Sequence, residues 1–237
     1  MNAEVLAVGA HPDDVEVGIG ALVHKLTTAG CATAILDLTR GEMGSRGSAE
    51  ERKVEADDSA DVLGVTTRLN TDLPDGGVAN TAEQRRPIIE AIRRIRPRVL
   101  FLPMSDDRHP DHHAAHRLVR DAAYFAGLIR IETDAPPHRP ERIYFYRVYG
   151  EDAMPQMIVN VDKHFEAKMA ALRCFRSQFH NPEYDGPETF IATREFLESI
   201  RTRAAWFGNR IGAAYGEALY VDGPISVDLP PGLERTP

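Results

Sequence analysis

Short, uninterrupted apolar runs alternate with longer amphipathic segments through the first half of the chain, and this alternation constrains the fold more than any other feature. The apolar runs stand at 5–10, 34–38 and 99–102, with a weaker one at 66–70. Helical periodicity follows them at 14–29, 49–63, 81–96 and 111–126. Continuous apolar runs are typical of strands covered on both faces. Four strand–helix repeats therefore predict an α/β fold, a Rossmann-like, mostly parallel sheet flanked by helices.

The second half of the chain is less regular. Strands are expected at 144–148 and 157–161, and helices at 162–176 and 188–208. Pro136 and Pro137 mark a join rather than a flexible linker. We therefore expect a single domain over residues 1–237, with a core of about 1–130 and a C-terminal strand and helix elaboration of about 131–237.

Charge and cysteine content exclude several classes of protein. The 237 residues include 28 Lys and Arg against 36 Asp and Glu, a net charge of −8, whereas a nucleic-acid binder normally shows a basic surplus. The two cysteines, Cys31 and Cys174, are too few for a disulfide scaffold and indicate a reducing compartment. The first residues lack a basic region, so we expect no leader, and no apolar stretch approaches the roughly 20 residues of a spanning helix. We expect a cytoplasmic protein that binds neither nucleic acid nor membrane.

A dinucleotide site would require the pattern G-x-G-x-x-G at the start of the first helix. Gly18 and Gly20 lie one turn inside that helix, and the strand end holds His11, Asp13 and Asp14 instead. Carboxylates at that position would repel a pyrophosphate. The sequence therefore argues against a dinucleotide-binding domain.

Histidine and aspartate gather in two segments that follow predicted strands. His11-Pro12-Asp13-Asp14-Val15-Glu16 follows the first strand, and Asp106-Asp107-Arg108-His109-Pro110-Asp111-His112-His113 follows the strand at 99–102. In the commonest order of a doubly wound sheet these two strands are neighbours where the strand order reverses. Segments about a hundred residues apart in sequence are therefore expected to meet in space.

Imidazole and carboxylate groups together form the ligand set of zinc, and Fe(II) accepts it too. His11, Asp14 and one histidine of the second segment would supply three ligands and leave a position for water. Asp13 could then take a proton from that water. Plainer alternatives exist, since Asp13 or Asp14 could cap the following helix and the later histidines could form a solvated helix face.

The motifs His11-Pro12-Asp13-Asp14-x-Glu16 and His109-Pro110-Asp111-His112 resemble those of the PIG-L/LmbE-like N-acetylglucosaminide deacetylases. The resemblance covers nearly the whole chain and is closest to the bacillithiol biosynthesis deacetylases, which act on N-acetylglucosaminyl malate. Supporting segments are Glu51-Arg52-Lys53-x-Glu55-Ala56, Leu69-Asn70 with Pro74-Asp75, Pro137-His138-Arg139, and Ser177-Gln178-Phe179.

The resemblance implies a zinc ion held by His11, Asp14 and His112, with Asp13 as general base. It implies that His109 is a cationic group near the carbonyl oxygen of the substrate. Asp111 would hold His109, although the sequence alone does not decide which histidine Asp111 orients. The family further implies a homo-oligomer, often a hexamer.

Contacts with an anionic sugar conjugate are also implied by the resemblance. Arg52 and Arg139 would bind the malate carboxylates, because guanidinium binds carboxylate in a bidentate manner. Asp75 would accept from sugar hydroxyls, although Asp-Gly is also a plain turn signal, and Arg108 is either a substrate contact or a loop-stabilising charge. One departure stands out: Phe196 occupies the position where relatives carry an auxiliary tyrosine.

The expected function is removal of the N-acetyl group from an N-acetylglucosamine conjugate, with the malate glycoside as the expected substrate. A deacetylase for a different N-acetylglucosaminide stays open. The triplet Asp111-His112-His113 also matches DHH phosphoesterases, but no further aspartate motif stands at Thr39–Glu42 to hold two metal ions about 3.5–4 Å apart. A module that only binds metal or sugar would have no use for Asp13.

Overall fold

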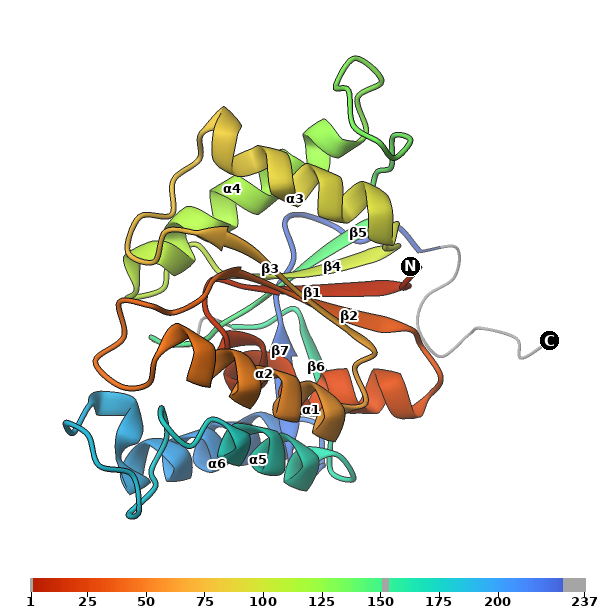
Figure 1. The fold of residues 1–237 in the computed structure, drawn as a ribbon. Coiled ribbons are helices and arrows are strands. Elements are labelled where there is room, and N and C mark those ends of the chain that lie inside the picture. Colours follow the sequence, from red (N-terminus) through yellow and green to blue (C-terminus); the bar gives the residue numbers. More distant parts are fainter. Residues whose placement is uncertain (1, 151–153, 228–237) are drawn as a thin grey trace.

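Five parallel strands form the central sheet, in the order β3-β2-β1-β4-β5 (Figure 1). They are β1 (Val5–Gly9), β2 (Thr33–Thr39), β3 (Thr67–Leu73), β4 (Val99–Pro103) and β5 (Arg142–Tyr146). Strands β1 and β4 are neighbours, and Val5 pairs with Val99. The predicted parallel α/β fold is therefore confirmed, including the point where strand order reverses.

The computed structural model describes residues 2–150 and 154–227, so the two ends of the domain expected over 1–237 lie outside the described residues. Strand β5 belongs to the central sheet although it lies beyond residue 130, where we expect the core to end. The segment after residue 130 is thus part of the sheet as well as a covering for it.

Helices cover both faces of the sheet (Figure 1). The helices α3 (Ala82–Ile95) and α4 (Pro110–Ala126) pack on one face. The other face carries α1 (Asp14–Thr28) and α2 (Ala49–Leu63), with α5 (Phe165–Cys174) and α6 (Arg194–Asn209) outside them. Both faces of β1 are consequently buried, with Leu6 in one apolar core and Ala7 in the other. Within the described residues no helix combines the length and apolar character needed to cross a bilayer.

A short antiparallel pair, β6 (Met157–Asn160) and β7 (Gly216–Leu219), completes the fold beside α1. Helix α1 is kinked at Ile19, where φ is −137° and ψ is 24°. Glu217 of β7 accepts the N–H groups of Ala21 and Leu22 just after the kink, at 3.2 and 2.6 Å. Lys168 pairs with Glu217 at 2.6 Å, so this buried carboxylate is neutralised. The C-terminal segment thereby supports the helix that begins at Asp14.

Candidate active site

The turns that follow β1 and β4 meet at the carboxyl edge of the sheet, as the strand order predicts. They line a cavity of about 330 Å³. Eight of the ten site residues predicted from the sequence line this cavity: His11, Asp13, Asp14, Arg52, Asp75, Arg108, His109 and His112. The exceptions are Asp111, which lies just behind the lining residues, and Arg139.

The turn between β1 and α1 has an unusual backbone at Asp13. Its φ is 120°, a region that residues other than glycine rarely adopt. Asp13 stands at the N-cap position of α1, yet its side chain makes no capping hydrogen bond. Asp14 closes the turn instead, because its Oδ2 accepts the N–H of His11 at 2.9 Å. The alternative in which Asp13 is only a helix cap is therefore wrong.

The start of α4 places the second group of histidines. His109 is the N-cap, and its Nδ1 accepts the N–H of Asp111 at 3.2 Å. Pro110 takes the first helical position, where a missing N–H costs no hydrogen bond. His112 follows in the first turn with its side chain fully buried, and its Nε2 lies 3.1 Å from Asp14 Oδ1. His112 therefore cannot belong to a solvated helix face.

The residues brought together can hold a metal ion. Nitrogen atoms of His11, His109 and His112 lie within 4.8 Å of one another. Asp14 contacts two of these rings, at 3.5 Å from His11 Nδ1 and 3.1 Å from His112 Nε2. Both ring nitrogens of His112 are buried, and neither makes a hydrogen bond of normal geometry within the described part of the chain. A cation at His112 Nε2 would satisfy one of them, and imidazole with carboxylate is a donor set that suits zinc.

Carboxylates around the imidazoles favour positive charge in the cavity. Burial disfavours a protonated His11, but Asp111, Asp14 and Asp75 outweigh burial and raise the pKa of His11 well above its ordinary value. Burial likewise opposes protonation of His112, whereas Asp14 and its neighbours raise the pKa of that ring to about 9. A site that stabilises imidazolium in this way also attracts a divalent cation.

Asp13 faces Arg52 of α2, with Asp13 Oδ2 at 3.0 Å from Arg52 Nη2. Burial raises the pKa of Asp13 to about 7, in spite of the opposing charge of Arg52. A carboxylate that titrates near neutrality is well matched to the task of a general base. The position and the proton affinity of Asp13 are both consistent with that role.

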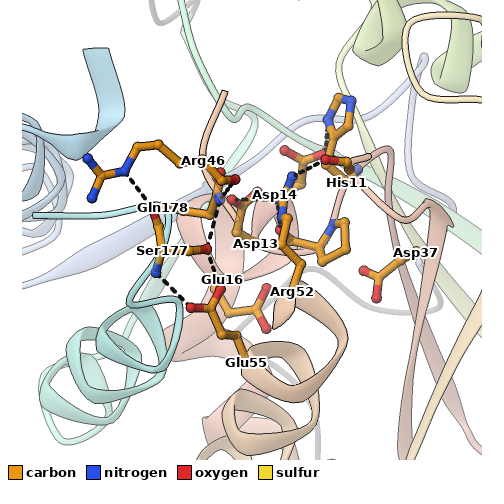
Figure 2. A network of polar contacts seen from close by, with 12 residues as sticks. His11, Asp13, Asp14, Glu16, Asp37, Arg46, Arg52, Glu55, Ser177 and Gln178 are labelled. Atoms are coloured by element: carbon orange, nitrogen blue, oxygen red, sulfur yellow. Dashed lines mark hydrogen bonds and ion pairs between the residues drawn. The ribbon is translucent and has the colours of Figure 1, made fainter. Parts of the chain in front are cut away.

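Arg52 has partners other than the ones that the sequence predicts. We expect it to bind substrate carboxylates, but Nη2 donates to the Pro12 carbonyl at 2.5 Å as well as to Asp13, and Nη1 donates to the Gly41 carbonyl at 3.3 Å. The side chain is buried, and Nε alone of its nitrogens has no acceptor among the described residues. Arg52 thus holds the base and the loop in front of it (Figure 2).

The structure pairs the Asp111 carboxylate with a histidine other than His109, the one that the resemblance implies. The structure joins His109 Nδ1 to the backbone N–H of Asp111, while Asp111 Oδ2 accepts the N–H of Gly76 at 2.7 Å and lies 3.4 Å from His11 Nε2. Burial, together with the nearby His11, lowers the pKa of His109. The ring is therefore neutral, carries its proton on Nε2, and remains a hydrogen-bond donor. Asp111 serves His11, because the helix start turns its carboxylate toward that ring.

The remaining predicted contacts divide into two that reach the cavity and one that does not. Asp75 Oδ1 lies 3.1 Å from His11 Nε2, and Asp75 Oδ2 accepts the N–H of Met43 at 2.8 Å. Arg108 is an exposed residue of the cavity lining, with its guanidinium 4.0 Å from the centroid of Phe190. Arg139 instead donates to the carbonyl of Tyr124 at 3.1 Å, at the far end of α4. The structure does not bring Arg139 to this site.

Phe196 is buried and packs against Tyr149, with ring centroids 5.9 Å apart. It lines a neighbouring groove rather than the cavity itself. The cavity wall at this point is Tyr149, whose ring stacks on that of His112 at a centroid distance of 5.5 Å. A tyrosine is therefore present beside the candidate metal ligands, although it comes from a different part of the chain.

Two features of the site lie outside the sequence prediction. Asp107, next to the histidine motif, lies 3.0 Å from His112 Nδ1. The sequence feature that could have identified Asp107 is its position two residues before His109 in the same loop. The second feature is a polar network that reaches the cavity at Gln178, shown in Figure 2. Glu55 of α2 accepts the N–H and the hydroxyl of Ser177 at 2.6 and 2.7 Å, and Gln178 donates to the Arg46 carbonyl at 2.6 Å.

Comparison with known proteins agrees with this arrangement. The model of the PIG-L family, described as GlcNAc-PI de-N-acetylase, matches residues 6–123, which include both histidine segments. The diacetylchitobiose deacetylase of Thermococcus kodakarensis is 30% identical over 231 residues, which cover 91% of this chain and 82% of that protein.

Two solved structures share the fold over most of their length. The conserved protein TT1542 from Thermus thermophilus has a TM-score of 0.88 and 36% identity, covering 99% of this chain and 100% of that one. The N,N'-diacetylchitobiose deacetylase from Pyrococcus horikoshii has a TM-score of 0.80 and 26% identity, with coverage of 93% and 84%.

Proposed function

The chain belongs to the PIG-L family of deacetylases that act on GlcNAc-containing substrates, and from this premise we propose that it is a zinc-dependent hydrolase with Asp13 as its general base. The observation that carries the proposal is the position of Asp13. Its carboxylate lies in the same cavity as three imidazoles, is not used as a helix cap, and has a pKa raised by burial to about 7. Fe(II) would suit the same donor set.

In the proposed mechanism His11, Asp14 and His112 would hold the metal ion. Zinc bound there would lower the pKa of a water molecule towards about 7 and polarise the acetyl carbonyl. Asp13 takes a proton from the attacking water as the new C–O bond forms. His109 donates its Nε2–H to the carbonyl oxygen, which becomes negatively charged.

The C–N bond then breaks, and the amine must gain a proton to leave. Asp13 returns the proton that it took, so one carboxylate acts first as base and then as acid. The products are acetate and the free amino sugar. Arg52 stabilises the ionised form of Asp13 between turnovers through its contact at 3.0 Å.

We propose N-acetylglucosaminyl malate as the substrate, and this part of the proposal rests on Arg108. Arg108 lines the cavity and is exposed, so it can bind a carboxylate of the malate group. A second candidate is diacetylchitobiose, because the Thermococcus and Pyrococcus relatives are diacetylchitobiose deacetylases. A homo-oligomer remains part of the proposal.

The test is acetate release from N-acetylglucosaminyl malate, diacetylchitobiose and free N-acetylglucosamine, each with and without a chelator. We expect the malate glycoside to react fastest and the chelator to abolish all activity. Equal rates on the malate glycoside and on the free sugar would contradict the malate assignment. Activity that survives the chelator would contradict the mechanism. One zinc ion per chain is expected, whereas two manganese ions would favour the phosphoesterase alternative.

A further inference from the structure

Asp107 lies in the loop between β4 and α4, and its side chain and that of His112 are both fully buried. Its Oδ1 lies 3.0 Å from His112 Nδ1, while Asp14 lies 3.1 Å from the other ring nitrogen, Nε2. We propose that Asp107 is a positioning residue that sets the zinc affinity by holding the His112 ring, and that it ties this ring to the cavity wall at Tyr149. The inference rests on the metal centre of the proposed function.

The position of the proton on His112 follows from which ring nitrogen would bind the metal. A histidine that ligates a metal through one ring nitrogen keeps its proton on the other, and the partner of that proton fixes the ring. The ligating nitrogen of His112 is Nε2, because another candidate ligand, Asp14, faces it. The proton is therefore on Nδ1, where Asp107 Oδ1 faces it as an ion-pair partner at 3.0 Å, without hydrogen-bond geometry among the described residues. A carboxylate in this position makes the ring a stronger ligand.

Asp107 also holds the backbone on both sides of the His112 ring. Oδ1 also accepts the N–H of His109 at 3.0 Å, and Oδ2 accepts the N–H of Tyr149 at 2.8 Å. The Tyr149 ring in turn stacks on His112, with an angle of 13° between the planes. Asp107 therefore acts on His112 twice: at the edge of the ring directly, and on its face through Tyr149. Loss of the carboxylate would release both contacts at once.

The neighbouring carboxylate provides a matched control. Asp106 pairs with Arg147 at 2.8 Å, and its side chain is 61% exposed. The same substitution can therefore be made one residue away, at an acid that serves a different partner. A general effect of lost negative charge in this loop would appear in both variants, whereas the proposed effect belongs to Asp107 alone.

The test compares zinc dissociation constants of the metal-free full chain by competition with a chromophoric chelator. We expect Asp107→Asn to weaken zinc binding by about 10–100-fold, Asp107→Ala to weaken it further, and Asp106→Asn to match the wild type. Cobalt(II) in place of zinc gives a visible absorption spectrum that depends on ligand geometry. We expect this spectrum to shift in Asp107→Asn and to stay unchanged in Asp106→Asn.

Wild-type zinc affinity and an unchanged cobalt spectrum in Asp107→Asn would overturn the proposal, even if that variant unfolds at a lower temperature. A purely structural carboxylate would give only that loss of stability. If Asp107→Ala does not fold, Asp107→Asn decides the question. Neither readout needs a deacetylase substrate. A wild-type chain that binds zinc but releases no acetate would contradict the proposed function and leave the role of Asp107 standing.

Discussion

Asp13 combines a strained backbone with a buried carboxylate. Its φ of 120° places it in a region where strain costs on the order of 1–3 kcal/mol. The surroundings offset that cost: Arg52 donates to the Asp13 carboxylate and to the Pro12 carbonyl of the same turn. Because the side chain is turned away from the helix N–H groups, its carboxylate is available to the cavity.

Asp13→Ala is expected to lower kcat by about 10²–10⁴-fold, the usual contribution of a general base. Zinc content is expected to stay near that of the wild type, because His11, Asp14 and His112 remain. Acetate release and metal analysis of the dialysed variant measure the two effects. The control is Asp57→Ala, the same change at an exposed carboxylate of α2. Unchanged turnover in Asp13→Ala would remove Asp13 as the base.

The ion pair of Asp106 and Arg147 predicts a pH dependence of stability. Its hydrogen bonds with Arg147 lower the pKa of Asp106 from its ordinary value of 3.8. Stability from a lowered carboxyl pKa is present above the unfolded value and is lost as the pH falls through the folded value. Because Asp106 is largely exposed, we expect the free energy of unfolding of the wild type to exceed that of Asp106→Asn by less than about 1 kcal/mol at pH 6.

Urea unfolding of both proteins between pH 6 and pH 3 measures this difference. The gap between the two unfolding free energies should close as the pH falls below about 4. A gap that widens toward low pH would contradict the assigned direction of the pKa shift.

The loop after β2 depends on one glycine. Gly41 has a φ of +68°, and a Cβ at this position would lie 1.8 Å from Arg52 Nη1. Arg52 fills the space beside the loop and reaches Asp13 from there. A side chain at residue 41 would therefore act on the general base through Arg52.

Gly41→Ala is expected to reduce kcat by about 10²-fold. The new methyl group would displace the Arg52 side chain, and the Asp13 carboxylate that Arg52 holds would move away from its productive position. The control is Gly212→Ala, which has a similar φ of +71° and open space where the Cβ would lie. Backbone strain is then the same in both variants, and only the first meets a side chain. Similar activity in the two would show that the Arg52 contact does not matter for turnover.

Most elements were predictable because their signals are local. Thr81 caps α3 by accepting the N–H of Gln84, and the helix accommodates Pro87 in its second turn, so the expected range of 81–96 is close to the observed one. Strand β7 was not predicted. Its four residues, Gly216–Leu219, form no apolar run, since Glu217 faces Lys168 and the N–H groups of α1. Such a strand is determined by tertiary contacts that leave no local pattern.

Across the molecule, the candidate ligands come from two turns that are far apart in the sequence and that neighbouring strands of the sheet bring together. His11 and Asp14 follow β1, and His112 follows β4. Strand order made this convergence predictable from the sequence. The orientation of individual side chains was not predictable, because several partners lie within reach of Asp111 and of Arg52 in the folded chain. The position of Arg139 was not predictable either, since it lies at the opposite end of the 17-residue helix α4.

Zinc is expected to stabilise the whole fold, because it binds the folded chain and joins the two turns. At a free zinc concentration of 1,000 times Kd, the gain is about 4.1 kcal/mol. Thermal unfolding with and without a chelator measures it as a rise in Tm. Asp14→Asn is expected to reduce the zinc-dependent rise, whereas Asp57→Asn should keep it. An identical Tm for metal-free and zinc-loaded wild type would contradict a metal site between these turns.

The hydrogen bonds from Ala21 and Leu22 to Glu217 have a consequence for the order in which the protein is made. A ribosome adds His112 and then needs a further 217 − 112 = 105 residues to reach Glu217. At roughly 5–20 residues per second this takes about 5–20 s. Throughout that interval the nascent chain carries every proposed zinc ligand, but the N–H groups of Ala21 and Leu22 lack Glu217, their acceptor. The hydrogen bonds at the kink of α1 can therefore form only after the C-terminal strand has been made.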